Sequence, residues 1–145
     1  MKVKFVKLRE TAHIPTKGSD KAAGYDLYAA LNEDIEIKAG TLAKISTGLA
    51  ITPPKGYFGA IFARSGAATK QGLRPANCVG VCDEDYTGEY IVALYNDSQE
   101  TQTIHNGDRI AQLVFLPYFS AEFEEVDCLD KTDRGTGGFG STGTN

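Results

Sequence analysis

Residues 80–88 read GVCDEDYTG and run directly into the apolar segment 89–96. Three acids and a tyrosine between glycines are poor core material, whereas the segment that follows is rich in residues that strands favour. Residues 85–88 have the composition of a four-residue turn, so we predict a hairpin with Asp83 at or near its tip. A carboxylate there can reach a ligand and accept a proton. The alternative for this stretch alone is an acidic tip that is merely solvated.

Short strand-like segments lie on both sides of this stretch. Turn signals separate them, such as Pro-Pro-Lys-Gly at 53–56 and Asn-Gly at 106–107, at the spacing of roughly 8 to 12 residues that sandwiches and barrels show. Helical periodicity is nearly absent. We therefore predict an all-β protein, a sandwich or barrel. The strand candidates are residues 3–5, 35–37, 42–52, 57–63, 90–95 and 109–118, of which the last two are the strongest.

One short helix is predicted after the segment 57–63. Ser65 is a good N-cap and Gly72 a good stop, which gives about two helical turns. A serine hydroxyl, exposed backbone N–H groups and the neighbouring Arg64 would suit phosphate oxygens. The alternative is an ordinary helix cap beside a surface arginine.

The composition places the protein among small globular domains. The chain has 145 residues, of which 41% are hydrophobic, and a formal net charge of −4, which argues against general nucleic-acid binding. Three cysteines are consistent with reduced thiols, and they lack the pairing that a zinc site needs. No apolar run approaches the roughly 20 residues that span a bilayer, so we expect an intracellular, cytoplasmic protein without membrane contact.

Two further segments place polar residues among apolar ones. Asp26 is an acid early in an otherwise apolar strand, where it needs a partner or exposure, and an edge-strand acid is the simpler interpretation. Gln112 lies between apolar residues, and a buried amide without a hydrogen bond costs a few kcal/mol. Its partner could be backbone or ligand, and these residues alone favour backbone.

The C-terminal segment, residues 133–143, is the least core-like part of the chain. It contains the pattern G-x-G-x-x-G, but no strand leads directly into it, so a dinucleotide-binding loop is not supported. One arginine, two hydroxyls and Phe139 on a glycine-rich arm could fold over a phosphorylated ligand that contains a ring. The alternative is a disordered tail. We predict one β domain, residues 1–132, followed by a flexible arm, residues 133–145, that closes over the active site.

Five of these segments resemble, in order, the five motifs of the trimeric dUTP pyrophosphatase (dUTPase) family. The resemblance spans residues 22–143 and rests on segments 23–27, 64–66, 80–88, 107–113 and 134–143. It implies a jelly-roll-like β-sandwich and a homotrimer with three active sites built between subunits. It also implies Mg²⁺-dependent hydrolysis of dUTP to dUMP and pyrophosphate, which limits dUTP and supplies dUMP for thymidylate synthesis.

The resemblance also implies roles for individual residues. Asp83 would bind and polarise the water that attacks the α-phosphorus, and Tyr86 would pack under the deoxyribose. Asn77 and Gly80 would contact uracil, Phe139 would cover it, and Asp26 would lie near the water ligands of the metal. The remaining expected substrate contacts, mostly to phosphate, are Arg64, Ser65, Gly66, Gln112, Arg134, Gly140, Ser141 and Thr142.

Two positions depart from the family pattern. Two alternative functions also remain open. Cys82 stands where the family usually has an aliphatic residue, and Ala63 where it often has proline. A dCTP deaminase, or a bifunctional deaminase and dUTPase, would need a glutamate that we do not find in the region around Asp83. A non-catalytic nucleotide-binding regulatory protein would have no need of that water-activating aspartate.

Overall fold

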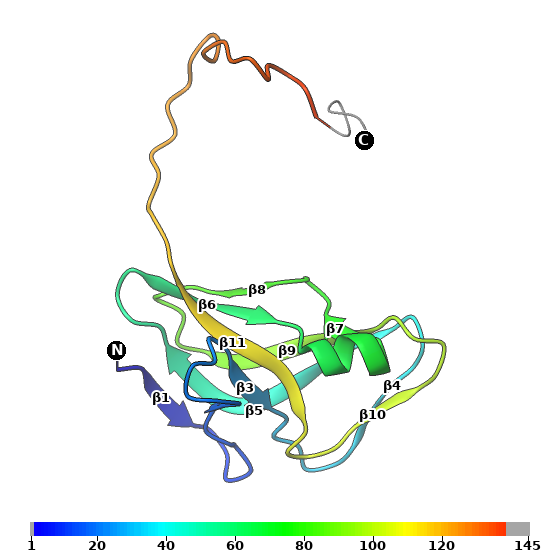
Figure 1. Cartoon of the computed structure of the whole chain (residues 1–145). Helices are drawn as coiled ribbons and strands as arrows, with labels where there is room; N and C mark the ends of the chain where they lie inside the picture. The colour runs from blue at the N-terminus through cyan, green and yellow to red at the C-terminus, as the bar shows by residue number, and fades with distance from the viewer. Residues whose placement is uncertain (1, 139–145) are drawn as a thin grey trace.

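Two antiparallel sheets packed face to face make up most of the protein, as expected for a β-sandwich (Figure 1). The computed structural model describes residues 2–138. The first sheet has four strands in the order β1 (Lys4–Lys7), β5 (Leu42–Thr52), β9 (Glu89–Asn96) and β7 (Leu73–Pro75). The second has five, in the order β2 (Thr16–Lys17), β3 (Tyr25–Tyr28), β11 (Arg109–Pro117), β6 (Tyr57–Phe62) and β8 (Gly80–Cys82). A separate ribbon joins β4 (Ile35–Ile37) to β10 (Gln102–Ile104).

The core lies between the two sheets, because each sheet directs one set of alternate side chains inward. In β9, for example, Tyr90, Val92 and Leu94 are buried while Ile91 is half exposed. The other large core side chains come from both sheets, including Leu27, Ile45, Leu49, Ile61 and Leu113. The all-β prediction is therefore confirmed.

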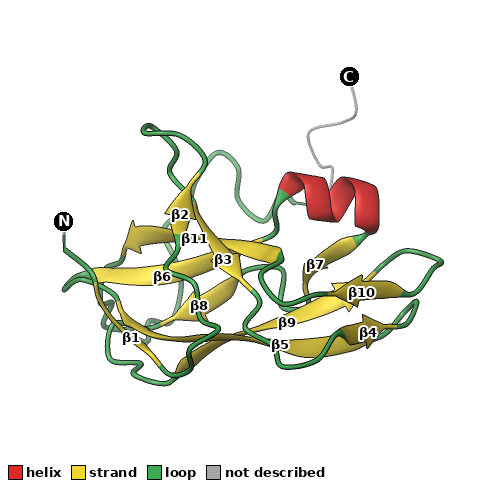
Figure 2. Ribbon diagram, turned by 90° about the horizontal axis from the view of Figure 1, so that it is seen from below, coloured by secondary structure: helices red, strands yellow, loops and turns green. Residues whose placement is uncertain are grey.

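Within residues 2–138, the helical segment lies where it was predicted: Ser65 and Gly66 are already helical and lead into the π-helical turn η1 (Ala67–Gln71), but its start differs from the prediction (Figure 2). The N-cap of η1 is Gly66, with no side-chain capping hydrogen bond. The prediction of a Ser65 side-chain cap was wrong, because the serine takes part through its carbonyl oxygen, which accepts the Thr69 hydroxyl at 2.8 Å. Gly72 ends the turn in the left-handed conformation, as predicted.

The loop 83–88 does not close a hairpin. β8 pairs with β6 in one sheet and β9 pairs with β5 and β7 in the other, so the loop crosses between the sheets. Its turn lies at residues 83–86, where the Tyr86 N–H donates to the Asp83 carbonyl at 3.1 Å, and not at 85–88. Turn composition located the reversal to within two residues, but it could not reveal that the flanking strands join different sheets.

Beyond β11, the chain leaves the sandwich. Residues 118–138 carry no helix or strand and extend away from the sheets (Figure 1). Phe119 and Phe123 are each more than nine-tenths exposed. Within residues 2–138, no helix has the length and apolar character needed to cross a membrane.

Candidate active site

A polar cleft of about 440 Å³ opens beside the second sheet, where β3, β11 and the end of β6 meet. Five residues singled out in the sequence line it together: Asp26, Arg64, Ser65, Gly66 and Gln112. They come from three segments that are far apart in the chain, and the sheet order β3-β11-β6 makes those segments neighbours.

Asp26 is the charge centre of this cleft. Its side chain is only 14% exposed and accepts hydrogen bonds from Arg64 Nε at 2.7 Å and Arg109 Nη1 at 3.4 Å. The carboxylate thus has two partners, as its place in an apolar strand required. Because Asp26 engages one nitrogen of Arg64, the guanidinium is held at the cleft with donors left for an anion.

Gln112 lies at the same cleft and hydrogen-bonds to the backbone, as the sequence around it led us to expect. Its Nε2 donates to the Ala63 carbonyl at 2.8 Å. Gly24 leaves room for it, since a Cβ at that position would lie 2.5 Å from Gln112 Oε1. The small residues before β3 therefore make space for a side chain of β11.

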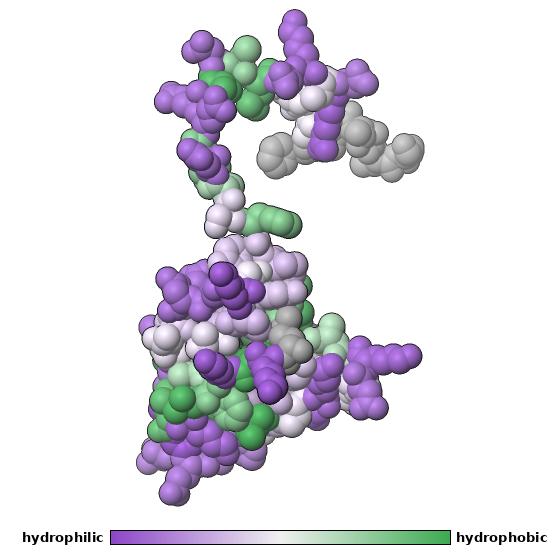
Figure 3. All heavy atoms as spheres, turned by 90° about the vertical axis from the view of Figure 1, so that its left-hand side faces the viewer, coloured by the Kyte–Doolittle hydropathy of each residue, from purple (hydrophilic) through white to green (hydrophobic). Residues whose placement is uncertain are grey.

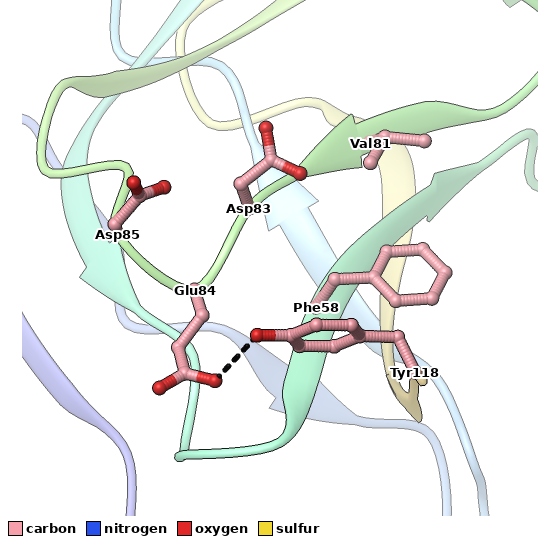
Figure 4. A pocket seen from close by; sticks show the side chains of 6 residues that line it. All are labelled: Phe58, Val81, Asp83, Glu84, Asp85 and Tyr118. Carbon is pink, nitrogen blue, oxygen red and sulfur yellow. Dashed lines mark hydrogen bonds between the residues drawn. The ribbon is translucent and has the colours of Figure 1, made fainter. Parts of the chain in front are cut away.

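The loop 83–88 borders a second, larger cleft, of about 740 Å³ (Figure 4). Phe58, Val81 and Tyr118 form its apolar part, and Asp83, Glu84 and Asp85 its acidic part. Asp83 is exposed, and its side chain points away from that of Glu84 (Figure 4). An exposed carboxylate at the rim of a cleft can accept a proton from a bound water.

Glu84 fastens this loop to the sandwich. Its Oε2 accepts the Gly56 N–H at 2.6 Å and the Tyr118 hydroxyl at 2.9 Å (Figure 4). The Gly56 N–H, and after it the Tyr118 hydroxyl, lower the pKa of Glu84 below its ordinary value. The same contact raises the pKa of Tyr118. Asp83 therefore lies between the end of β8 and Glu84, and both neighbours are held by the sandwich.

Asn77 and Gly80 lie together beside β6. A Cβ at Gly80 would come within 3.1 Å of Ile61 Cβ and 3.5 Å of Asn77 Nδ2, so the Asn77 amide lies over the Gly80 backbone. Gly80 is buried and Asn77 is exposed. An amide side chain beside a bare peptide can form several directional hydrogen bonds to a planar polar ring.

Within one chain, Asp83 and the polar cleft are far apart. Cys82 pairs with Gly59 near the start of β6, whereas Arg64 follows the end of that strand. Six residues of extended chain separate Phe58, beside Asp83, from Arg64, which is roughly 20 Å at about 3.3 Å per residue. The expected catalytic aspartate and the expected phosphate contacts are therefore not brought together in a single copy.

Among the described residues of the C-terminal segment, Arg134 is not brought to either cleft. Arg134 is exposed, and its Nε donates to the Gly137 carbonyl at 3.0 Å, in the part of the chain that extends from the sandwich. Phe139, Gly140, Ser141 and Thr142 lie outside the described residues.

Arg109 lies within segment 107–113 but was not predicted as a site residue. The structure places it on Asp26 and in the lining of the polar cleft. Its position at the start of β11, beside β3, was the signal that could have identified it, because Arg109 pairs with Tyr28, two residues from Asp26.

A protein-built metal cage is not found among residues 2–138, where no group of three or more His, Cys, Asp or Glu side chains converges. Asp26 is the one carboxylate among the described residues lining the polar cleft, and two arginines already engage it. This donor set fits an ion held mainly by the phosphates of a ligand and by water, as Mg²⁺ often is in nucleotide sites.

These features define a class: a β-sandwich protein with a basic, hydrogen-bonding cleft suited to a phosphate chain and a separate exposed aspartate. The family model described as dUTPase matches residues 10–143. A deoxyuridine 5'-triphosphate nucleotidohydrolase of Desulfitobacterium hafniense is 49% identical over 144 residues, which cover 99% of this chain and 95% of the relative. The chain belongs to the dUTPase family.

Solved structures agree with this assignment. A variant of the Staphylococcus bacteriophage 80alpha dUTPase, solved with dUpNHpp, superposes with a TM-score of 0.87 at 27% identity and covers 98% of each chain. A variant dUTPase from phage phi11 of S. aureus, described with a coordinated structural Mg(II) ion, gives a TM-score of 0.81 at 25% identity, covering 90% of this chain and 100% of that one.

Proposed function

We propose that this protein hydrolyses dUTP to dUMP and pyrophosphate in a Mg²⁺-dependent reaction. Family membership and the named activity of the 49% identical relative support the reaction. The structural observation that carries it is the polar cleft, where the Asp26–Arg64 ion pair and Gln112 provide fixed donors for a triphosphate. Fixed donors of this kind are the main protein contribution to phosphoryl transfer.

The polar cleft binds the phosphate chain. Arg64 supplies positive charge, and Ser65 and the Gly66 peptide are exposed at the start of η1, where a hydroxyl and an N–H can each donate to a phosphate oxygen. Gln112 is held in place by Ala63 and presents its amide to the same cleft. Mg²⁺, when bound, neutralises charge on the phosphates, and Asp26 lies where it can accept hydrogen bonds from the water ligands of the ion.

Asp83 is the general base. It accepts a proton from water as the water oxygen bonds to the α-phosphorus, while the bond from that phosphorus to the α,β-bridging oxygen breaks and pyrophosphate leaves. Tyr86 packs under the deoxyribose, and Asn77 with the Gly80 backbone binds the uracil edge. The exposed faces of Tyr86 and Asn77 and the small Gly80 support these roles.

The C-terminal arm closes each site. In this proposal Arg134, Gly140, Ser141 and Thr142 contact the triphosphate, and Phe139 covers uracil. The separation of the described arm from its own sandwich agrees with an arm that reaches a site elsewhere. Closure would exclude bulk water and leave the attacking water in place.

The active unit is a homotrimer. About 20 Å of extended chain between Phe58, beside Asp83, and Arg64 exceeds the reach of one water bound at an α-phosphate, which supports the proposal that Asp83 of one copy serves the cleft of another. Three copies related by cyclic symmetry build three such sites. An apolar outer surface on β6, β8 and β11, which includes Phe58, Val81 and Leu116, supports association over this sheet.

The tail, residues 118–133, matches the surface around the N-terminal strand in charge and in apolar character. Residues 118–133 combine exposed Phe119, Phe123 and Leu129 with six acidic side chains: Glu122, Glu124, Glu125, Asp127, Asp130 and Asp133. The N-terminal strand carries lysines around exposed Phe5 and Val6, beside an apolar groove of about 230 Å³. Figure 3 views that side of the molecule and shows apolar surface among polar residues. We expect the tail of one copy to lie on this surface of another.

The experiment that tests the function is pyrophosphate release with Mg²⁺ from dUTP, dCTP, dTTP and UTP, measured for the wild type and for Asp83→Asn. We expect turnover of dUTP alone, with kcat lower by about 10²-fold or more in the variant, since a positioned base contributes about that much. Ammonia release from dCTP would favour the deaminase instead. Tight dUTP binding without turnover would indicate a binding protein, and light scattering on the same samples gives the oligomeric state.

A further inference from the structure

The ring of Tyr86 lies folded back on its own loop. Its hydroxyl donates to the carbonyl oxygen of Glu89 at 2.9 Å, and its ring lies 6.1 Å from the Tyr90 ring, with 34° between the two planes. The residue is 43% exposed, so part of the ring remains open to a ligand. Two contacts therefore fix where the open part of the ring lies.

Gly88 makes this position possible. A Cβ at residue 88 would lie 2.5 Å from Tyr86 Oη, 2.7 Å from Cζ and 3.0 Å from Cε2. The glycine is not among those with a positive φ, so the backbone itself would accept another residue. The space occupied by the Tyr86 ring is what requires glycine here.

Glu89 holds the acceptor of the tyrosine hydroxyl. Its Oε1 accepts the Gly48 N–H at 2.8 Å and the Ser46 hydroxyl, and its Oε2 accepts Arg9 Nη2 at 3.3 Å. Ser46 and Gly48 lie at the bulge of β5, where the pairing with β9 shifts. The side-chain hydrogen bonds of Glu89 thereby hold its backbone carbonyl against the sheet. The Tyr86 hydroxyl donates to that carbonyl, which holds the ring in place.

We propose that Gly88 and Glu89 determine sugar specificity by holding the Tyr86 ring flat against the position of the deoxyribose. The inference rests on the proposed function, in which Tyr86 packs under that sugar. Neither residue touches the substrate, so both are positioning residues. A ring held in one place leaves no room for a 2′-hydroxyl, whereas a ring free to move would admit one.

The test compares kcat/KM for dUTP and UTP in the wild type, Gly88→Ala and Glu89→Ala. We expect the dUTP to UTP ratio to fall by about tenfold or more in both variants, since sterically enforced discrimination is lost when the ring can shift. Glu89→Gln keeps an oxygen that accepts from Ser46 and Gly48, so its ratio should stay within about threefold of wild type. Thr87→Ala, at an exposed position of the same loop, is the matched control.

Two results would overturn the inference. One is an unchanged ratio in Gly88→Ala and Glu89→Ala while Tyr86→Ala lowers it. The other is an equal loss for both substrates, which indicates a merely structural role. If Gly88→Ala fails to fold, Tyr86→Phe replaces it in the test, because it removes only the hydroxyl contact to Glu89. The dUTP to UTP ratio of kcat/KM should also fall in Tyr86→Phe. A wild type that does not hydrolyse dUTP would overturn the proposed function instead, and this inference with it.

Discussion

Asp83 and Glu84 are adjacent acids in different surroundings. Glu84 accepts two hydrogen bonds from the sandwich, whereas the Asp83 carboxylate is exposed at the cleft (Figure 4). A general base must be positioned yet free to accept a proton, and an anchored neighbour provides the positioning. Glu84 therefore fastens the loop, and the exposed Asp83 carboxylate suits its proposed role as general base.

The lowered pKa of Glu84 gives a pH dependence of stability. A carboxyl group with a folded-state pKa below its ordinary 4.5 stabilises the fold above that pH, and the contribution is lost as the pH falls through the folded-state pKa. We expect the melting temperature of Glu84→Gln to lie furthest below that of the wild type near neutral pH, and the difference to shrink below pH 4.5. A difference that stays constant down to pH 3 would contradict the role of the ionised carboxylate.

The hydrogen-bonding needs of Asp26 and Gln112 could be predicted from the sequence, but the residues that meet them could not. That Asp26 needed a partner followed from its place in an apolar strand. Its partners, Arg64 and Arg109, lie 38 and 83 residues away in sequence, and only the order of the strands brings them to it. The backbone partner of Gln112 was predictable in kind, whereas its identity, Ala63, required the pairing of β11 with β6.

Long strands were easier to predict than short ones. The predicted strand 42–52 coincides with β5 (Leu42–Thr52), because eleven residues rich in apolar and β-branched side chains give a long, clear signal. β7, β8 and β10 have three residues each and were not predicted, whereas the equally short β4 (Ile35–Ile37) was, because its two isoleucines alternate with acids. The prediction of a hairpin at 80–96 was wrong because β8 and β9 belong to different sheets. Sheet membership depends on pairing between distant segments, which local sequence does not show.

The bulge of β5 offers a test of how the element is stabilised. Gly48 has φ +65°, and a Cβ there would lie 2.7 Å from Arg9 Cγ and 2.9 Å from Ala12 Cβ. We expect Gly48→Ala to lower the free energy of unfolding by about 2 kcal/mol or more, from backbone strain and overpacking together. Gly40→Ala, at φ +70° with its nearest contact at 3.9 Å, is the control and should lose only about 1 kcal/mol.

Urea denaturation of the two alanine variants measures this difference. Equal losses at Gly48 and Gly40 would show that close packing at the bulge adds nothing to the backbone cost.

In the proposed trimer, the assembled protein joins parts that one chain keeps apart. The sandwich carries the polar cleft at one end of β6 and Asp83 near the other, and the arm extends away from both. Nothing in the local sequence pattern could reveal this separation, since the five motifs are read in order along one chain. The proposed trimer accounts for it without any change in the fold.

Removal of the arm should separate activity from stability. We expect deletion of residues 134–145 to reduce kcat by about 10²-fold or more, because closure and phosphate contacts are lost, while the melting temperature changes little. Residues 134–138 make no contact with the sandwich in the described structure, which supports the unchanged stability. Parallel losses of turnover and of melting temperature would contradict this division. Thermal unfolding and pyrophosphate release on the same preparations are the required measurements.

The most direct test of the shared site mixes two inactive variants. Asp83→Asn lacks the base, and Arg64→Gln lacks the cleft charge while it keeps a donor for Asp26. Unfolded and refolded together in equal amounts, they should recover about one quarter of wild-type dUTP turnover, because each site then draws its aspartate and its cleft from randomly chosen copies. A mixture as inactive as the separate variants would show that one chain supplies both parts, and would contradict the account.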